Sequence, residues 1–130
     1  MSEWRSETAA DLAEAKELVD SALGSLSGEP TKDQLRAVWL AYIKVEKSIA
    51  FIKIDMEEEN PGRFIKLKPY QVPDERQALQ FALKNLKKGS EDFAVGDFGQ
   101  ALKDLRESRN YLRALLRQKR LARARRARAS

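Results

Sequence analysis

Five arginines near the C-terminal end of the chain recur at steps of three and four residues. They are Arg106, Arg109, Arg113, Arg117 and Arg120. This spacing places all five on one face if the segment is an α-helix. A guanidinium group can hold two oxygens of a phosphate at once through its planar fork of N–H donors. The row would extend for about 20 Å, so the chemistry it predicts is the binding of successive phosphates.

Charge is distributed unevenly along the chain. Residues 113–130 hold eight of the 25 Lys and Arg residues and none of the 20 Asp and Glu residues, so the rest of the chain is slightly acidic. This asymmetry predicts a polyanionic partner, either nucleic acid or an acidic protein. The residues predicted to bind nucleic acid are Arg106, Arg109, Arg113, Arg117, Lys119, Arg120, Arg123, Arg125, Arg126 and Arg128. Because no base-reading motif accompanies them, we expect backbone contacts with weak sequence preference, and RNA or a ribonucleoprotein as the favoured target.

Two other interpretations of this basic segment are open. Cations at the C-terminal end of a helix interact favourably with its dipole by about 0.3–1 kcal/mol each, but only within the last turn. That effect accounts for two or three of the ten residues. A solvated, solubilising tail is the second interpretation. It belongs to an alternative function, in which the protein is a protein–protein interaction or scaffold module.

The elements that must position the arginines are helices. Apolar residues recur at helical spacing over residues 8–26, over 32–59, from about 73 to 95 and from 98 onward. The capping-box pattern at Thr31 and Gln34 begins the second of these helices. The short links at 27–31 and 96–97 require antiparallel neighbours. We therefore predict an all-α four-helix bundle made of two antiparallel helical hairpins joined by an extended crossover at 61–73, with a C-terminal basic helical extension.

The apolar stripes identify the expected core. They comprise Leu12, Ala15, Val19, Ala22 and Leu26; Leu35, Val38, Tyr42, Val45, Ile49, Ile52 and Met56; Leu79, Ala82, Leu86 and Phe93; and Phe98, Ala101, Leu105, Leu112 and Leu115/Leu116. In the last helix the next core-facing positions include Lys119 and Arg126. We therefore expect packing to end near Leu116. This divides the chain into a bundle domain at 1–116 and an Arg-rich extension at 117–130, partly disordered when free.

One hairpin carries a family resemblance. Gly89, Gly96, Phe98, Ala101 and Leu105 stand at the spacing of one tetratricopeptide hairpin, and residues 89–105 resemble that unit. Residues 8–59 do not repeat the pattern. The resemblance implies two antiparallel helices joined by a tight turn, and it implies no function.

The predicted crossover is a secondary candidate for phosphate contact. Arg63, Lys66 and Lys68 alternate there with aromatic residues that include Tyr70. Basic residues mixed with aromatics can hold phosphates and stack bases. In the alternative interpretation the apolar residues of this segment plug the end of the bundle and the lysines face water.

The second helix has a second apolar face. Leu40 and Phe51 lie opposite its main stripe, which indicates burial on both sides. Either this helix is central and partly covered by the crossover, or Leu40 and Phe51 form the interface of a homodimer.

Charged residues of the second helix also need partners. Glu46 and Lys53 lie within its apolar stripe, and we expect them to reach solvent or to pair with charges on neighbouring helices. The acidic residues Asp55, Glu57, Glu58 and Glu59 follow. In one alternative they receive the basic tail of the same chain or of a second copy.

The chain lacks the residues that several classes of protein function require. The chain has no His and no Cys, and it shows neither a phosphate-cradling glycine loop nor a recognisable metal-ligand set. We therefore predict a protein that is not an enzyme and uses no metal or cofactor. A polar N-terminus and the lack of an apolar run of about 20 residues predict a cytoplasmic protein without a membrane partner.

Overall fold

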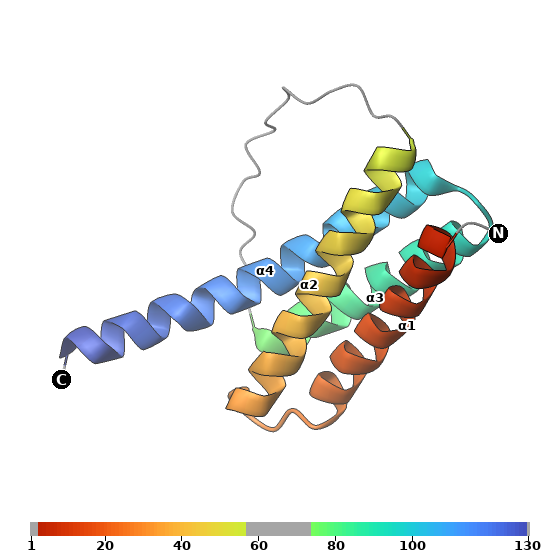
Figure 1. Cartoon of the computed structure of the whole chain (residues 1–130). Helices are drawn as coiled ribbons and strands as arrows, with labels where there is room; N and C mark the ends of the chain where they lie inside the picture. Colours follow the sequence, from red (N-terminus) through yellow and green to blue (C-terminus); the bar gives the residue numbers. More distant parts are fainter. Residues whose placement is uncertain (1–2, 57–73, 130) are drawn as a thin grey trace.

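A computed structural model describes residues 3–56 and 74–129, which contain four α-helices (Figure 1). The helices are α1 (Glu3–Gly24), α2 (Lys32–Asp55), α3 (Glu75–Ala94) and α4 (Phe98–Ala129). The predicted all-α fold with four helices packed as a bundle is confirmed. The predicted crossover at 61–73 and the acidic residues at 57–59 lie outside the described residues.

Each helix packs against two neighbours that run antiparallel to it. α1 and α4 occupy opposite corners of the bundle, and each contacts both α2 and α3. Trp4 at the start of α1 meets Phe93 near the end of α3. At the other end of the bundle, Arg76 near the start of α3 donates a hydrogen bond to the carbonyl oxygen of Leu26, just beyond α1. α2 therefore finishes at the end of the bundle opposite to the one where α3 begins.

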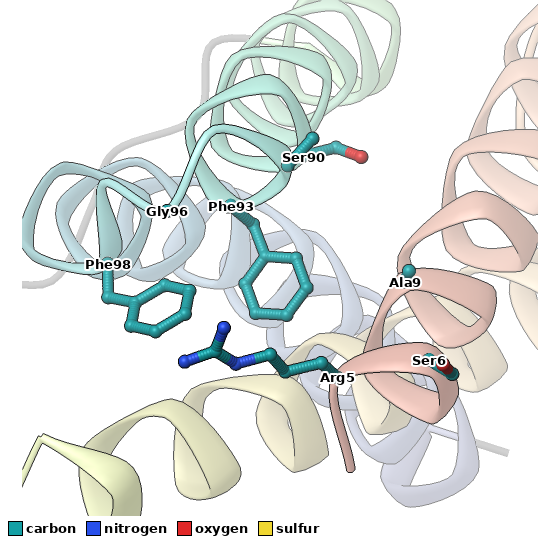
Figure 2. Close-up of a pocket in the computed structure, with 8 residues that line it drawn as sticks. Arg5, Ser6, Ala9, Ser90, Phe93, Gly96 and Phe98 are labelled. Atoms are coloured by element: carbon teal, nitrogen blue, oxygen red, sulfur yellow. The ribbon is translucent and has the colours of Figure 1, made fainter. Parts of the chain in front are cut away.

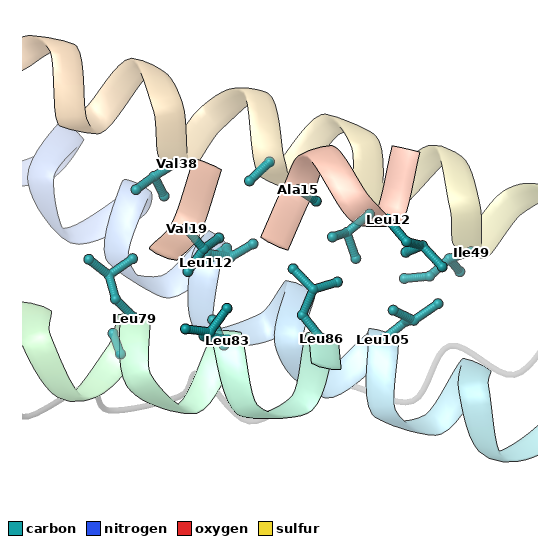
Figure 3. Close-up of a cluster of buried hydrophobic side chains, with 14 of the residues drawn as sticks. Leu12, Ala15, Val19, Val38, Ile49, Leu79, Leu83, Leu86, Leu105 and Leu112 are labelled. Carbon is teal, nitrogen blue, oxygen red and sulfur yellow. The ribbon is translucent and has the colours of Figure 1, made fainter. Parts of the chain in front are cut away.

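Side chains from all four helices fill one core, and Figure 3 shows them pointing into a shared interior. Leu12, Val38, Leu86 and Leu112, one from each helix, are each no more than 1% exposed. The predicted stripes of α1 and α3 are buried throughout. Burial of this kind is worth about 1.5–3 kcal/mol for each large aliphatic side chain, which makes the core the main stabilising term.

The predicted stripe of α2 needs correction at its ends. Met56 is exposed, because it stands past the end of α2 as its C-terminal cap. Leu35 and Tyr42 are only partly buried. Trp39, on the same helix, is exposed. A helix offers the core only about a third to a half of its circumference, and α2 has more apolar residues than that arc can accommodate.

Local sequence signals explain where the helices begin. The capping box is confirmed: the Gln34 amide donates to Thr31 Oγ1 at 3.2 Å, and the Thr31 amide donates to Gln34 Oε1 at 2.8 Å. Asp74 caps α3 through a 2.6 Å bond from the Gln77 amide to its carboxylate. Gly96 has φ of 83° in the turn before α4, a left-handed conformation that a side chain would strain.

The α3–α4 hairpin is closely packed around Gly89. A Cβ atom at this position would lie 2.9 Å from the side chain of Leu105, so only glycine lets the two helices approach this closely. Near the same seam the hydroxyl of the buried Ser108 donates to the carbonyl oxygen of Ala82 at 2.7 Å. The residue that interrupts the apolar stripe of α4 is therefore a hydrogen-bonded part of the core.

Candidate nucleic-acid interface

α4 continues well past the bundle as a single helix. It runs to Ala129, and its C-terminal part projects away from the other three helices (Figure 1). Alanine and arginine favour helix here, because neither loses much side-chain freedom in it. The expectation that residues 117–130 are partly disordered when free stays a prediction. In the structure, residues 117–129 continue α4 as helix.

The five arginines of the predicted row do not share one environment. Arg106 and Arg109 are partly buried, whereas Arg113, Arg117 and Arg120 are exposed. The boundary falls where the bundle stops covering this face of α4. The row therefore has a packed end and a solvent-facing end.

Arg109 is tied to the bundle. Its guanidinium donates to Glu46 Oε1 on α2 at 3.1 Å and to Asn110 Oδ1 at 3.3 Å, and its side chain is 19% exposed. A phosphate would have to displace these contacts to reach it. The expectation that Glu46 pairs with a charge on a neighbouring helix is confirmed by the same contact, while Lys53 is exposed.

Lys119 also packs against the bundle, one turn beyond the predicted end of packing at Leu116. Its side chain is 18% exposed and pairs with Glu75 at the start of α3, with Glu29 at 3.9 Å. The hydrogen bond from Lys119 lowers the pKa of Glu75 below its usual value. The aliphatic part of Lys119 can cover the end of the core while its ammonium group reaches these carboxylates.

Three acidic residues of α1 pair with lysines of α2. Glu7, Asp11 and Glu14 face two lysines of α2: Lys44 lies 2.7 Å from Glu14, and Lys47 lies 2.6 Å from Glu7. Hydrogen bonds to Glu14 and Glu7, respectively, raise the pKa of Lys44 and of Lys47. These three carboxylates pair with the lysines of α2, and the backbones of α1 and α4 do not approach each other closely.

Seven arginines on α4 remain exposed. They are Arg113, Arg117, Arg120, Arg123, Arg125, Arg126 and Arg128. α4 has no acidic residue after Glu107, so nothing on this helix offsets their charge locally. Beyond Arg120 the arginines point to several sides of the helix instead of one, since 123, 125 and 126 are not in phase with the row. The candidate interface is thus a row of three exposed arginines, Arg113, Arg117 and Arg120, followed by the tip of α4, where Arg123, Arg125, Arg126 and Arg128 point to several sides.

The predicted secondary contact and the predicted dimer interface involve residues outside α4. Arg63, Lys66, Lys68 and Tyr70 lie outside the described residues. Leu40 is 39% exposed, and Phe51 is partly buried with the Lys47 ammonium 5.8 Å from its ring.

Two exposed residues of α2 were missed by sequence reasoning. Trp39 and Ile43 are 51% and 43% exposed, and together with Leu40 they form an apolar patch on the outer side of α2. The signal was available in the spacing, because 39, 40 and 43 lie opposite the buried positions 38, 41 and 45 on a helical wheel.

A separate pocket of about 390 Å³ lies at the end of the bundle where α1 begins (Figure 2). Phe93 and Phe98 form one wall, and Arg5 extends toward Phe98 with its guanidinium carbon 5.0 Å from the ring centre. Trp4 packs edge-on to both rings. Arg5 therefore covers an aromatic cluster through cation–π contact, a role that accounts for it without a ligand.

Two carboxyl groups meet between α3 and α4. The Oδ2 atoms of Asp92 and Asp104 are buried and receive no hydrogen bond from the described N–H and O–H donors, while Asp104 Oδ1 accepts from Gln100 at 3.2 Å. A hydrogen bond to Asp104, together with burial, raises the pKa of Asp92.

Comparison with protein-family models, with curated proteins and with solved structures yields no match to this chain. Among residues 3–56 and 74–129, no helix combines the length and the apolar character needed to cross a bilayer.

Proposed function

We propose that this protein is a small non-enzymatic nucleic-acid-binding protein that holds phosphates on the exposed arginines of α4. One observation carries the proposal: Arg113 to Arg128 supply seven exposed guanidinium groups on a helix that projects from the bundle and has no acidic residue in that part. Like charges at this density repel each other until anions neutralise them. Binding of a phosphate backbone removes that repulsion and releases counter-ions.

The contrast with other basic residues supports this proposal. Arg109, Lys119, Lys44 and Lys47 all meet carboxylates of the protein itself. Five of the seven exposed arginines, from Arg120 onward, follow Lys119, which is the last of these paired basic residues along α4. RNA is favoured over a specific DNA site, because an arginine-rich helix binds phosphates of either polymer while no base-reading element accompanies it.

The test replaces four arginines of the tip: Arg123→Gln, Arg125→Gln, Arg126→Gln and Arg128→Gln in one variant. A matched control removes four exposed basic residues of the body: Lys32→Gln, Arg36→Gln, Lys84→Gln and Lys87→Gln. Both variants change the net charge equally. Affinities for tRNA and for duplex DNA are measured by fluorescence anisotropy at several salt concentrations from about 50 to 200 mM.

If about half of the seven arginines contact phosphates, log K falls with log salt at a slope of about −3. We expect the tip variant to bind at least about tenfold more weakly with a shallower slope, because each lost phosphate contact reduces the slope by about 1. The body control should keep the slope of the wild type. Equal losses in the two variants, or salt-insensitive binding, contradict the proposal.

The second candidate function is a protein–protein interaction module, and the exposed patch of Trp39, Leu40 and Ile43 favours it. In that case the patch on α2 contacts another protein or a second copy of the chain, and the tip of α4 only raises solubility. Sedimentation of the wild type and of Leu40→Lys separates the two: a dimer that Leu40→Lys dissociates assigns the patch to self-association.

A further inference from the structure

The register between α2 and α4 indicates that Trp39 stands near the basic face of α4. Glu46 on α2 meets Arg109 on α4 at 3.1 Å, and this contact sets the register of two antiparallel helices. Trp39 stands seven residues before Glu46 on nearly the same face of α2, about two turns away. The same displacement along α4 leads from Arg109 to the turn that carries Arg113 and Arg117. Trp39 and these two exposed arginines therefore share one surface of the molecule.

Trp39 is unusual among the aromatic residues for its exposure. Trp4 packs edge-on to Phe93 and Phe98 at 5.9 and 5.8 Å, whereas Trp39 leaves 51% of its surface exposed. A large apolar ring that faces water costs stability relative to burial. Ile43, one turn later on α2, is also exposed and extends the apolar surface beside the ring.

An exposed indole next to guanidinium groups has the composition of a single-strand binding surface. Arginines hold the backbone while a flat aromatic ring stacks on a base, and the stacking is tolerant of sequence because every base has a π face. Bases of a duplex are stacked on one another inside the helix and cannot reach a ring on a convex helical surface. Charge complementarity between the arginines and phosphates selects nucleic acid over an apolar partner for this patch.

We infer that Trp39 stacks on an unpaired base of a single-stranded nucleic-acid segment whose phosphates lie along Arg113 and Arg117. The inference rests on the proposed function and narrows it to targets with unpaired bases. The tip of α4 supplies affinity for any phosphate backbone, and Trp39 supplies the preference for single strands over duplexes.

The test compares Trp39→Ala with Phe81→Ala in the full-length chain. Phe81 is an exposed aromatic residue on α3, 41% exposed, and α3 does not contact α2. Affinities are measured for a single-stranded oligouridylate and for an RNA duplex at one salt concentration, and the salt slope is measured for each. Circular dichroism and thermal melting verify the fold of both variants, and Trp39→Phe serves as a second variant that keeps a ring.

We expect Trp39→Ala to weaken binding of the single strand by about five- to hundredfold, the effect of losing one stacked base. The duplex affinity and the salt slope should not change, because no phosphate contact is removed. Trp39→Phe should retain part of the affinity. Phe81→Ala should bind like the wild type.

The outcomes separate this inference from the proposed function. Wild-type binding of the single strand by Trp39→Ala, together with weak binding by the four-arginine tip variant, overturns the stacking inference alone. Equal losses for single strand and duplex also overturn it. If the tip variant binds like the wild type, the proposed function fails first. A dimer that Trp39→Ala dissociates without any change in nucleic-acid affinity assigns the patch to a second copy of the chain.

Discussion

The two halves of α4 contain the same residue types in different surroundings. In the half that packs on the bundle, Arg109 lies opposite Glu46, and the helix carries its two acids, Asp104 and Glu107. In the half that projects, from about Arg120 onward, there is no acid, and none of the other three described helices lies opposite (Figure 1). Arg109 in the first half holds two helices together, whereas Arg113 and Arg117 in the same half and the arginines of the second half are exposed. The role of a basic residue is therefore decided by the group that lies opposite it and not by the residue type.

The α1–α2 seam behaves like the packed half. Lys44 and Lys47 meet acids of α1, and the pairing uses carboxylates that a free basic tail would otherwise attract. This arrangement keeps the body of the protein close to neutral while the tip of α4 remains strongly basic. Separation of charge along the chain is thus preserved in three dimensions.

The largest expected difference between the two halves of α4 is the loss of stability when one leucine in each half is truncated. Leu112→Ala removes a fully buried side chain, and we expect it to lower the free energy of unfolding by about 3 kcal/mol through lost burial and a new cavity. Leu121→Ala changes a side chain that is 49% exposed and should cost less than about 0.5 kcal/mol. Urea denaturation followed by circular dichroism measures both. Similar losses at the two positions would mean that the projecting half is packed in solution.

A smaller effect is expected at the boundary between the halves. Lys119→Gln breaks the ion pairs with Glu75 and Glu29 and should cost about 1 kcal/mol at pH 7, while Arg117→Gln, exposed and two residues earlier, should cost almost nothing. The pKa of Glu75 is lowered in the folded state, so its contribution is present above its unfolded pKa and is lost as the pH falls through the folded value. Thermal melting at pH 7 and at successively lower pH should show the Lys119 effect shrink as the pH falls through the folded pKa of Glu75. An effect of Lys119→Gln that persists at low pH would assign it to packing.

The smallest expected effect concerns the acids of the packed half. Because the pKa of Asp92 is raised in the folded protein, the native state binds a proton more tightly than the unfolded state. Stability therefore falls as the pH rises through that raised value. Asp104→Asn removes one carboxyl group and offers Asp92 an amide donor, so we expect a melting temperature a few degrees higher than that of the wild type at pH 7. The difference should shrink as the pH falls through the folded pKa of Asp92, and a variant less stable than the wild type at pH 7 would contradict an unfavourable contact between the two carboxyl groups.

Much of the fold followed from local signals. The stripes at Leu12 to Leu26 and at Leu79 to Phe93 are buried as predicted, because an amphipathic helix can bury only its apolar side. Thr31 and Asp74 mark helix starts through caps that involve residues at most three positions away. Interactions between residues so close in the chain can be predicted from the sequence.

The division of the arginine row could not be predicted in the same way. Arg109 and Arg113 are equivalent on a helical wheel, yet only Arg109 meets Glu46, which is 63 residues away in the chain. The same holds for Trp39: a large aromatic side chain is usually well buried, but the buried arc of α2 is set by where α1 and α4 lie. Such outcomes depend on the register between helices, which no local pattern encodes.

By itself, the sequence determined that this chain forms four amphipathic helices and ends in a basic segment, since periodicity and charge are properties of consecutive residues. Only the tertiary structure decided which basic residues are paired with carboxylates and which stay exposed. It placed Glu46 and Glu75 against Arg109 and Lys119, and it left Trp39 exposed on the surface of α2. The physical reason is that pairing and burial depend on distances between helices, and those distances exist only once the bundle has formed.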